Sequence, residues 1–284
     1  MRVKGIIYVL ISALIYGFTP VLCSMTYKLG NTSLTLTFFR SFFVLPILII
    51  LMKKEHVSFY ITRNDFIKIF IVALFGAVFT TLLLYSSYQY IAVGTATTLH
   101  FLYPLFVTLI CHFIYHDNLR QKQIIALIIS LFGVVFFMDF KDLSTIQGIM
   151  MALISGFTFS IYLVGIEKFG LSTMNSYKLS FYIAASVCFC LAMINIFTGQ
   201  INLNQPKLSY ALMVLIAILA QFVAVILLKE GIAIIGSSLA SLFSMIEPVS
   251  SVIFGSIFLA ENISYMQIIG CVMIMAGVII LLKK

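Results

Sequence analysis

The chain has 284 residues, of which 62% are hydrophobic and 9% are charged, and its formal net charge is +8. Soluble domains are about half apolar and a quarter charged, so this composition excludes a water-soluble domain and requires the bilayer to solvate most of the surface. The basic residues are scattered, as they are in the cytoplasmic loops of membrane proteins, which argues against a nucleic-acid partner.

Long apolar runs, separated by charged or turn-like breaks, predict an all-α polytopic membrane protein. The strands of a membrane β-barrel would alternate apolar and polar residues, whereas these runs are continuous. A helix needs roughly 20 apolar residues to cross a bilayer, so the chain has room for about ten transmembrane helices. We expect these helices at 5–26, 35–52, 66–90, 95–115, 121–138, 147–166, 176–197, 208–229, 236–258 and 264–282.

Polar side chains inside the first four expected helices are candidate substrate-binding residues, because polar groups in a bilayer tend to face a cavity or a partner helix. In chain order, they are Tyr16, Tyr85, Tyr88, Gln89, Thr97, His100 and Tyr103. Pro104 follows directly and predicts a bend in the fourth helix. For Arg40 we favour an internal ion pair, although its side chain could also snorkel outward or bind a substrate carboxylate.

In the second half of the chain, Gln221 lies in mid-span, and the ninth expected helix is the most polar. Ser241, Ser244 and Pro248 share one face of that helix, and Glu247 borders the face. Such a face either lines a cavity or packs closely against another helix. Pro248 predicts a bend here too.

Glu247 is the strongest single candidate, because it lies roughly 16 Å into its span at 1.5 Å per residue. It could couple transport to protons or contact an amine-bearing substrate. It could also be a structural partner of Arg40 or bond across the helix bend. His100 is the second candidate for proton exchange, since imidazole titrates near physiological pH. An interior histidine bonded to a neighbouring tyrosine explains His100 equally well.

The basic residues also predict the orientation of the chain. With a cytoplasmic N-terminus, only Lys28, Lys141 and Lys207 fall in outside loops, Arg40 lies within a span, and the other basic residues face the cytoplasm. This bias predicts an even number of spans, with both termini in the cytoplasm of a multi-pass protein in the cell membrane.

The sequence contains an internal repeat. At an offset of 144 residues, Pro104 aligns with Pro248, Asn118 with Asn262, and 123–125 with 267–269. We therefore expect two halves, 1–142 and 143–284. Each half holds five spans, an odd number, so the second half would enter the bilayer from the opposite side. Inverted repeats of this kind are common in secondary transporters.

These motifs resemble the EamA family of the drug/metabolite transporter superfamily. The resemblance rests on residues 94–104 with the turn at 116–119, and on 236–249 with the turn at 260–263. One departure is Asp117, where the family usually carries Glu. The resemblance covers essentially the whole chain. The family includes exporters of amino acids and other small metabolites, so the resemblance implies a transport function.

Together these features favour a secondary transporter of a small organic metabolite, such as an amino acid or a related compound. We expect export by alternating access, with possible proton coupling, in a monomer or homodimer whose partners are a small-molecule substrate and the lipid bilayer. The alternative is a non-transporting protein of the same fold, a lipid scramblase-like factor or a receptor. No nucleotide-binding, zinc-protease or esterase motif occurs, and the five cysteines show no metal-ligand spacing, so we expect neither an enzyme nor a cofactor or metal.

Overall fold

A computed structural model describes residues 2–87, 90–91, 93–136, 146–260 and 263–282, and every regular element within these ranges is helical. The first half contains α1 (Arg2–Tyr27), α2 (Ser33–Lys54), α3 (Arg63–Ala73), η1 (Leu74–Phe79), α4 (Thr80–Ser87), α5 (Val93–His100), α6 (Tyr103–Phe113) and α7 (Gln121–Val135). The second half contains α8 (Ile146–Lys168), η3 (Leu171–Thr173), α9 (Ser176–Thr198), α10 (Lys207–Ile216), η4 (Ala217–Ala224), α11 (Val225–Ile235), α12 (Ser237–Ser244), α13 (Ile246–Leu259) and α14 (Tyr265–Leu282).

The lengths and compositions of these helices fit a multi-pass membrane protein. Within the described ranges, eight helices are long and apolar enough to cross a bilayer, and α6 and α7 are shorter apolar helices. Large apolar side chains on the outer surface remain exposed, among them Ile146, Phe197 and Tyr265. Such an apolar exterior suits lipid tails rather than water.

The same order of elements occurs twice along the chain. Two long helices are followed by one that contains a π-helical segment, then by one that is broken in the middle, then by a final helix. The π-helical segments are η1 and η4, and the broken helices are α5–α6 and α12–α13. The expected boundary between halves, at 142–143, lies outside the described residues.

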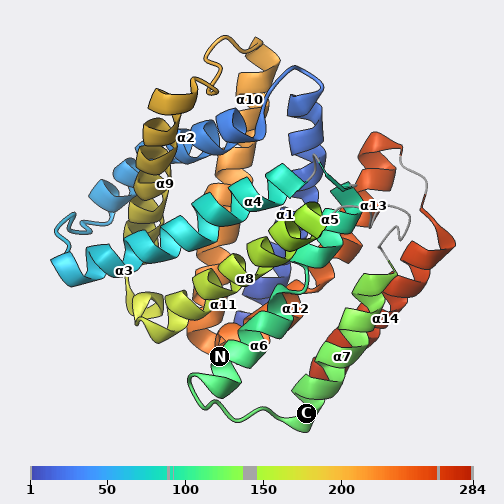
Figure 1. The fold of residues 1–284 in the computed structure, drawn as a ribbon. Coiled ribbons are helices and arrows are strands. Elements are labelled where there is room, and N and C mark those ends of the chain that lie inside the picture. Colours follow the sequence, from blue (N-terminus) through green and yellow to red (C-terminus); the bar gives the residue numbers. More distant parts are fainter. Residues whose placement is uncertain (1, 88–89, 92, 137–145, 261–262, 283–284) are drawn as a thin grey trace.

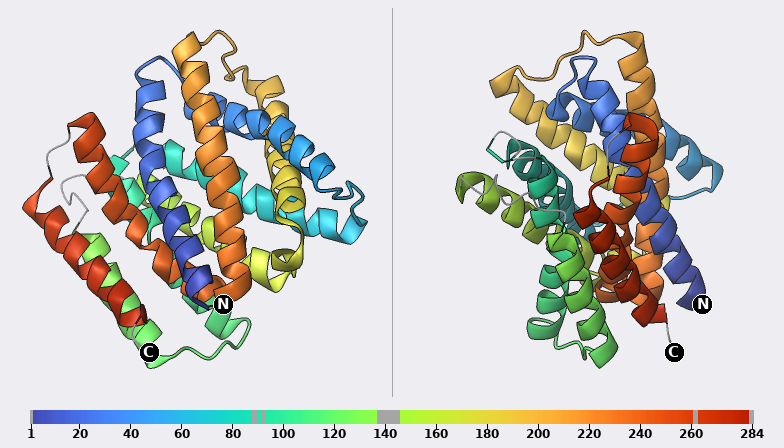
Figure 2. Two further views of the ribbon diagram at one scale, coloured as in Figure 1. Left: turned by 180° about the vertical axis from the view of Figure 1, so that it is seen from behind. Right: turned by 90° about the vertical axis from the view of Figure 1, so that its right-hand side faces the viewer.

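The packing follows a matching pattern (Figure 1). Helix α1 packs against α11, α12 and α13, while α8 packs against α4, α5 and α6. Helix α2 packs against α9, and α7 lies along α14 at the periphery. The start of α1 and the end of α14 lie at the same end of the molecule (Figure 2). We call this the terminal end.

One expected helix boundary is wrong for a clear physical reason. The eighth expected helix was to end at Lys229, but the helix continues to Ile235. Lys229 is only 5% exposed, and its ammonium donates to the Met174 carbonyl at 2.6 Å and to the Ser176 hydroxyl at 3.1 Å. A lysine whose ammonium has hydrogen-bond acceptors inside the protein can lie within a buried helix, so it does not mark the end of the helix. The helix ends instead at Gly236, whose φ of 81° requires a glycine-like backbone.

Candidate functional site

The two broken helices define the centre of the candidate site. Helix α5 stops at His100 and α6 starts at Tyr103, while α12 stops at Ser244 and α13 starts at Ile246. The structure places Pro104 and Pro248 in the first turn after each break. A first-turn proline costs no helical hydrogen bond, so each break satisfies the backbone while it ends the preceding segment.

Three helices bring opposite charges close to one aromatic side chain. Tyr16 on α1 lies within electrostatic range of Glu247 on α13 and of Arg40 on α2. Helix α1 can approach α13 this closely because Gly17 has no side chain: a Cβ there would lie 2.7 Å from the Glu247 carbonyl oxygen. Tyr103 and Tyr162 also lie within range of Tyr16. We call Tyr16, Arg40, Tyr103, Tyr162 and Glu247 the central polar cluster.

Several polar groups of the central polar cluster have no partner among the described residues. The ion pairs in these ranges are Lys168–Asp117, Lys168–Glu167 and Lys229–Glu230, so the expected ion pair of Arg40 with Glu247 is absent. The Nε of Arg40 and the hydroxyl of Tyr103 are buried without a hydrogen bond. The Ser244 hydroxyl lies beside Tyr103 but donates to the Ala240 carbonyl at 3.0 Å.

His100 is held by a neighbouring serine, not by a tyrosine as one interpretation of the sequence expected. Its Nδ1 lies 3.0 Å from the Ser155 hydroxyl, which itself donates to the Ala152 carbonyl at 2.6 Å. Because that proton is already committed, the histidine must donate from Nδ1, which leaves Nε2 as an acceptor. The imidazole also packs 5.7 Å from the ring of Tyr103 and 5.5 Å from that of Phe159.

The other predicted residues are more dispersed. Ser241 is buried and donates to the Ser238 carbonyl at 2.9 Å, so its proton stays within α12. Thr97 is half-buried on α5, one turn before His100. Gln221 is buried in η4, which packs against α1 and α2. The backbone of Tyr85 belongs to α4, but its side chain, and the whole of Tyr88 and Gln89, lie outside the described residues.

Two aromatic residues on α8 join the candidate site although the sequence did not predict them. The rings of Phe159 and Tyr162 stack at 5.7 Å, and Phe159 lies 4.9 Å from Tyr103 in an edge-on contact. The repeat contained a usable signal, since the offset of 143 that aligns Gly5 with Gly148 also aligns Tyr16 with Phe159. Helix α8 approaches closely here through Gly156, whose Cβ would lie 2.7 Å from the His100 carbonyl oxygen.

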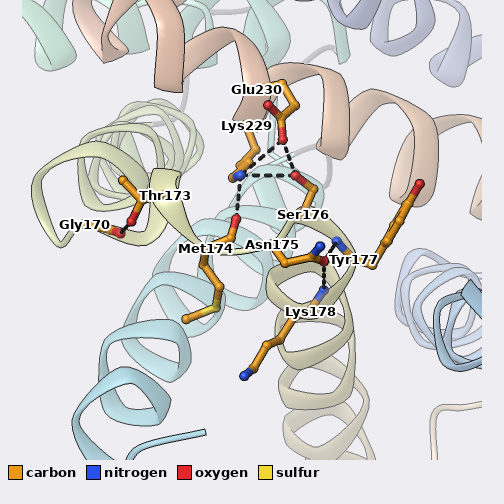
Figure 3. Close-up of polar contacts among 9 residues, drawn as sticks. All are labelled: Gly170, Thr173, Met174, Asn175, Ser176, Tyr177, Lys178, Lys229 and Glu230. Atoms are coloured by element: carbon orange, nitrogen blue, oxygen red, sulfur yellow. Dashed lines mark hydrogen bonds and ion pairs between the residues drawn. The ribbon is translucent and has the colours of Figure 1, made fainter. Parts of the chain in front are cut away.

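Two surface clefts open at the terminal end, and neither is lined by a predicted site residue. One, of about 630 Å³, lies between the start of α1, the start of α7 and the ends of α11 and α14. The other, of about 460 Å³, surrounds Lys229, Glu230 and Ser176 (Figure 3). Within the described part of the chain, no three His, Cys, Asp or Glu side chains gather as a metal site would require.

Comparisons with known proteins agree with this architecture. A model described as the EamA-like transporter family matches residues 3–138 and 146–283. An uncharacterized transporter of Bacillus subtilis, YcbK, is 22% identical over 285 residues, covering 94% of this chain and 89% of the relative. An uncharacterized transporter of Archaeoglobus fulgidus is 23% identical over 288 residues, covering 99% and 95%. A crystal structure that shares the fold superposes with a TM-score of 0.79 at 16% identity, covering 99% of this chain and 97% of the other.

Proposed function

Because the chain belongs to the EamA-like transporter family, we propose that it is a secondary transporter of a small zwitterionic metabolite, such as an amino acid. The observation that carries this proposal is that Tyr16 lies within electrostatic range of one acid, Glu247, and of one base, Arg40, both half-buried, and that no ion pair joins the two in the described structure. A charge enclosed by protein is costly unless it has a partner. A zwitterion bound between the two residues would supply a partner for each.

The chemistry of each group assigns its role in this proposal. The Arg40 guanidinium binds the carboxylate of the substrate, because its planar fork matches two carboxylate oxygens. The Glu247 carboxylate accepts from the ammonium group, and the Tyr103 hydroxyl, buried without a partner, supplies a further hydrogen bond. Tyr16, Tyr162 and Phe159 form aromatic walls that orient the side chain of the substrate. Thr97, Ser241, Ser244, Tyr85, Tyr88, Gln89 and Gln221 are the remaining candidate lining residues.

We propose ten transmembrane helices arranged as two inverted halves, 1–142 and 143–284. The repeated order of helices, and the reciprocal packing of α1 and α8 on the opposite half, support this arrangement. Both termini lie at one end of the molecule, as an even number of spans requires (Figure 2). The distribution of basic residues assigns this end to the cytoplasm.

In this scheme the two halves rock about the central polar cluster and expose it alternately to each side of the cell membrane. Glu247 and His100 are the groups proposed to couple this movement to protons. The Glu247 carboxylate forms no ion pair among the described residues, and the Nε2 of His100 is left as an acceptor, so each can take up a proton. Export is the proposed direction, in line with the exporters in the family.

Transport by purified protein in liposomes tests the proposal. A panel of amino acids, their decarboxylated amines and their des-amino acids is offered with and without a pH gradient. We expect uptake of at least one zwitterion, with no uptake of either truncated analogue. Glu247→Gln should abolish uptake, whereas Glu230→Gln, which removes an acid at the terminal end, should not. If no solute moves while fluorescent lipids exchange between leaflets, the protein is a scramblase-like factor and the proposal is wrong.

A further inference from the structure

A chain of charged contacts crosses the terminal end of the molecule. Lys168, near the end of α8, pairs with Asp117 at 2.6 Å and with Glu167 at 3.2 Å. Glu167 in turn accepts a hydrogen bond from the backbone N–H of Ser237, the first residue of α12. The contacts therefore link the turn after α6, the end of α8 and the start of α12.

Glu167 caps a helix that cannot cap itself. The residue before α12 is Gly236, which has no side chain to accept from the first N–H groups of the helix. A carboxylate is the favoured acceptor there, because the start of a helix carries partial positive charge. The cap comes from α8, which packs with α4, α5 and α6, and α12 packs with α1, α6, α8 and α11. The Glu167 contact thus holds the start of α12 at the place where this helix packs against α6 and α8.

The contact lies at the outer end of a seam between α6 and α12. Just inside it, the buried thiol of Cys111 lies 3.4 Å from the Ser237 hydroxyl. Further along the same two helices, Tyr103 lies beside Ser244. The seam therefore runs from Glu167 to the candidate site.

At the matching end of α1, the repeat counterpart of α8, the sequence has no acid or base at the positions of Glu167 and Lys168. At the offset of 143 that aligns these two helices, Glu167 aligns with Ser24 and Lys168 with Met25. Neither residue can form an ion pair of this kind at neutral pH. Helix α1 therefore cannot supply, at these positions, the carboxylate and the ammonium that α8 supplies at the terminal end.

We propose that Glu167 is a latch that closes the terminal end of the transport path, and that release of Ser237 opens the seam between α6 and α12. The inference rests on the proposed function, since a latch needs a path to close. The second cluster at this end, Lys229 with Glu230 and Ser176, joins α11 to α9 and does not cross the seam (Figure 3).

Labelling of the native Cys111 tests the latch without any transport measurement. Purified full-length protein in detergent is treated with a maleimide, and the modification of each cysteine is measured by peptide mass spectrometry. We expect Cys111 to be protected in the wild type. In Glu167→Gln and Glu167→Asp we expect labelling at least tenfold faster, which corresponds to about 1.4 kcal/mol less stable closure. Glu230→Gln, the matched control, should leave Cys111 protected.

The aspartate variant separates opening of the seam from a change in thiol ionisation. Glu167→Gln removes a negative charge near Cys111, which could by itself favour the reactive thiolate. Glu167→Asp keeps the charge but is one methylene too short to reach Ser237. Faster labelling in both variants supports the latch. Faster labelling in Gln alone, unchanged labelling in both, or reactive Cys111 in the wild type overturns it. Failure of the liposome assay with an opened seam would instead refute the proposed substrate transport.

Discussion

Replacing Gly156 with alanine would place a methyl group against the break between α5 and α6. The new Cβ would lie 2.7 Å from the His100 carbonyl oxygen, whereas ordinary van der Waals contacts begin at 3.4 Å. The two helices must therefore separate by about 0.7 Å, the difference between these distances. The obstacle is a backbone atom, so a side-chain rotation cannot relieve the clash.

The expected cost follows from this geometry. Overpacking a tight contact costs about 1–3 kcal/mol, and the better helix propensity of alanine returns at most about 1 kcal/mol. We expect a net loss of about 1 kcal/mol in the free energy of unfolding. For domains of roughly this size, that loss lowers Tm by about 2–4 °C.

Gly165→Ala on the same helix is the matched control. Its Cβ would meet a methyl carbon of the Val72 side chain at 2.8 Å, and the ring of Phe169 at 3.5 Å. Side chains can adjust where a carbonyl cannot, so we expect a smaller loss than at Gly156. The chain has no tryptophan, but it has buried cysteines, so a dye that fluoresces on reaction with exposed thiols can follow unfolding. Equal Tm values for the two variants, or a Gly156→Ala protein more stable than the wild type, would refute the reasoning.

Three further changes test other contacts. Ser12→Ala removes the 2.8 Å hydrogen bond to the Ala224 carbonyl that joins α1 to η4, and should cost about 0.5–1.5 kcal/mol of unfolding free energy in the same thermal assay; an unchanged Tm would contradict this. Lys229→Met leaves the carbonyl of the half-buried Met174 without its donor and should cost about 1–3 kcal/mol. Lys54→Met on the surface should change stability by no more than about 0.5 kcal/mol, and similar Tm values for both variants would show that Lys229 is dispensable. Arg40→Lys should weaken binding of the transported zwitterion at least tenfold, because an ammonium cannot make the bidentate contact that a guanidinium makes with a carboxylate. Binding is measured by ligand-induced thermal stabilisation, and an unchanged affinity would show that Arg40 does not bind the substrate.

Much of the fold could be predicted from the sequence because a bilayer imposes strong, local requirements. Apolar runs of span length had to be helices, since only helices satisfy their own backbone groups in lipid. Pro104 and Pro248 predicted bends in two helices, and the structure breaks the helix beside each of them, whereas α1 and α2 continue through Pro20 and Pro46. The structure adds that each proline lies just after the break, in the first turn of α6 and of α13.

The partners of the polar side chains were decided only by the tertiary structure. The sequence placed Glu247 and Arg40 inside the membrane but not relative to each other, because their separation depends on how α1, α2 and α13 pack. The charge of Lys229 predicted the end of a helix there. In the structure the Met174 carbonyl and Ser176 accept from this buried ammonium, and these contacts depend on tertiary packing. Nothing in the sequence predicted that Glu167 caps α12, since that contact joins residues 70 positions apart. The sequence by itself determined the family, the all-helical class of the fold and the two places where a proline interrupts a span, because these follow from local chemistry. The pairing of charges required the packed structure, because electrostatic and hydrogen-bond partners are set by distances between helices that are remote in the chain.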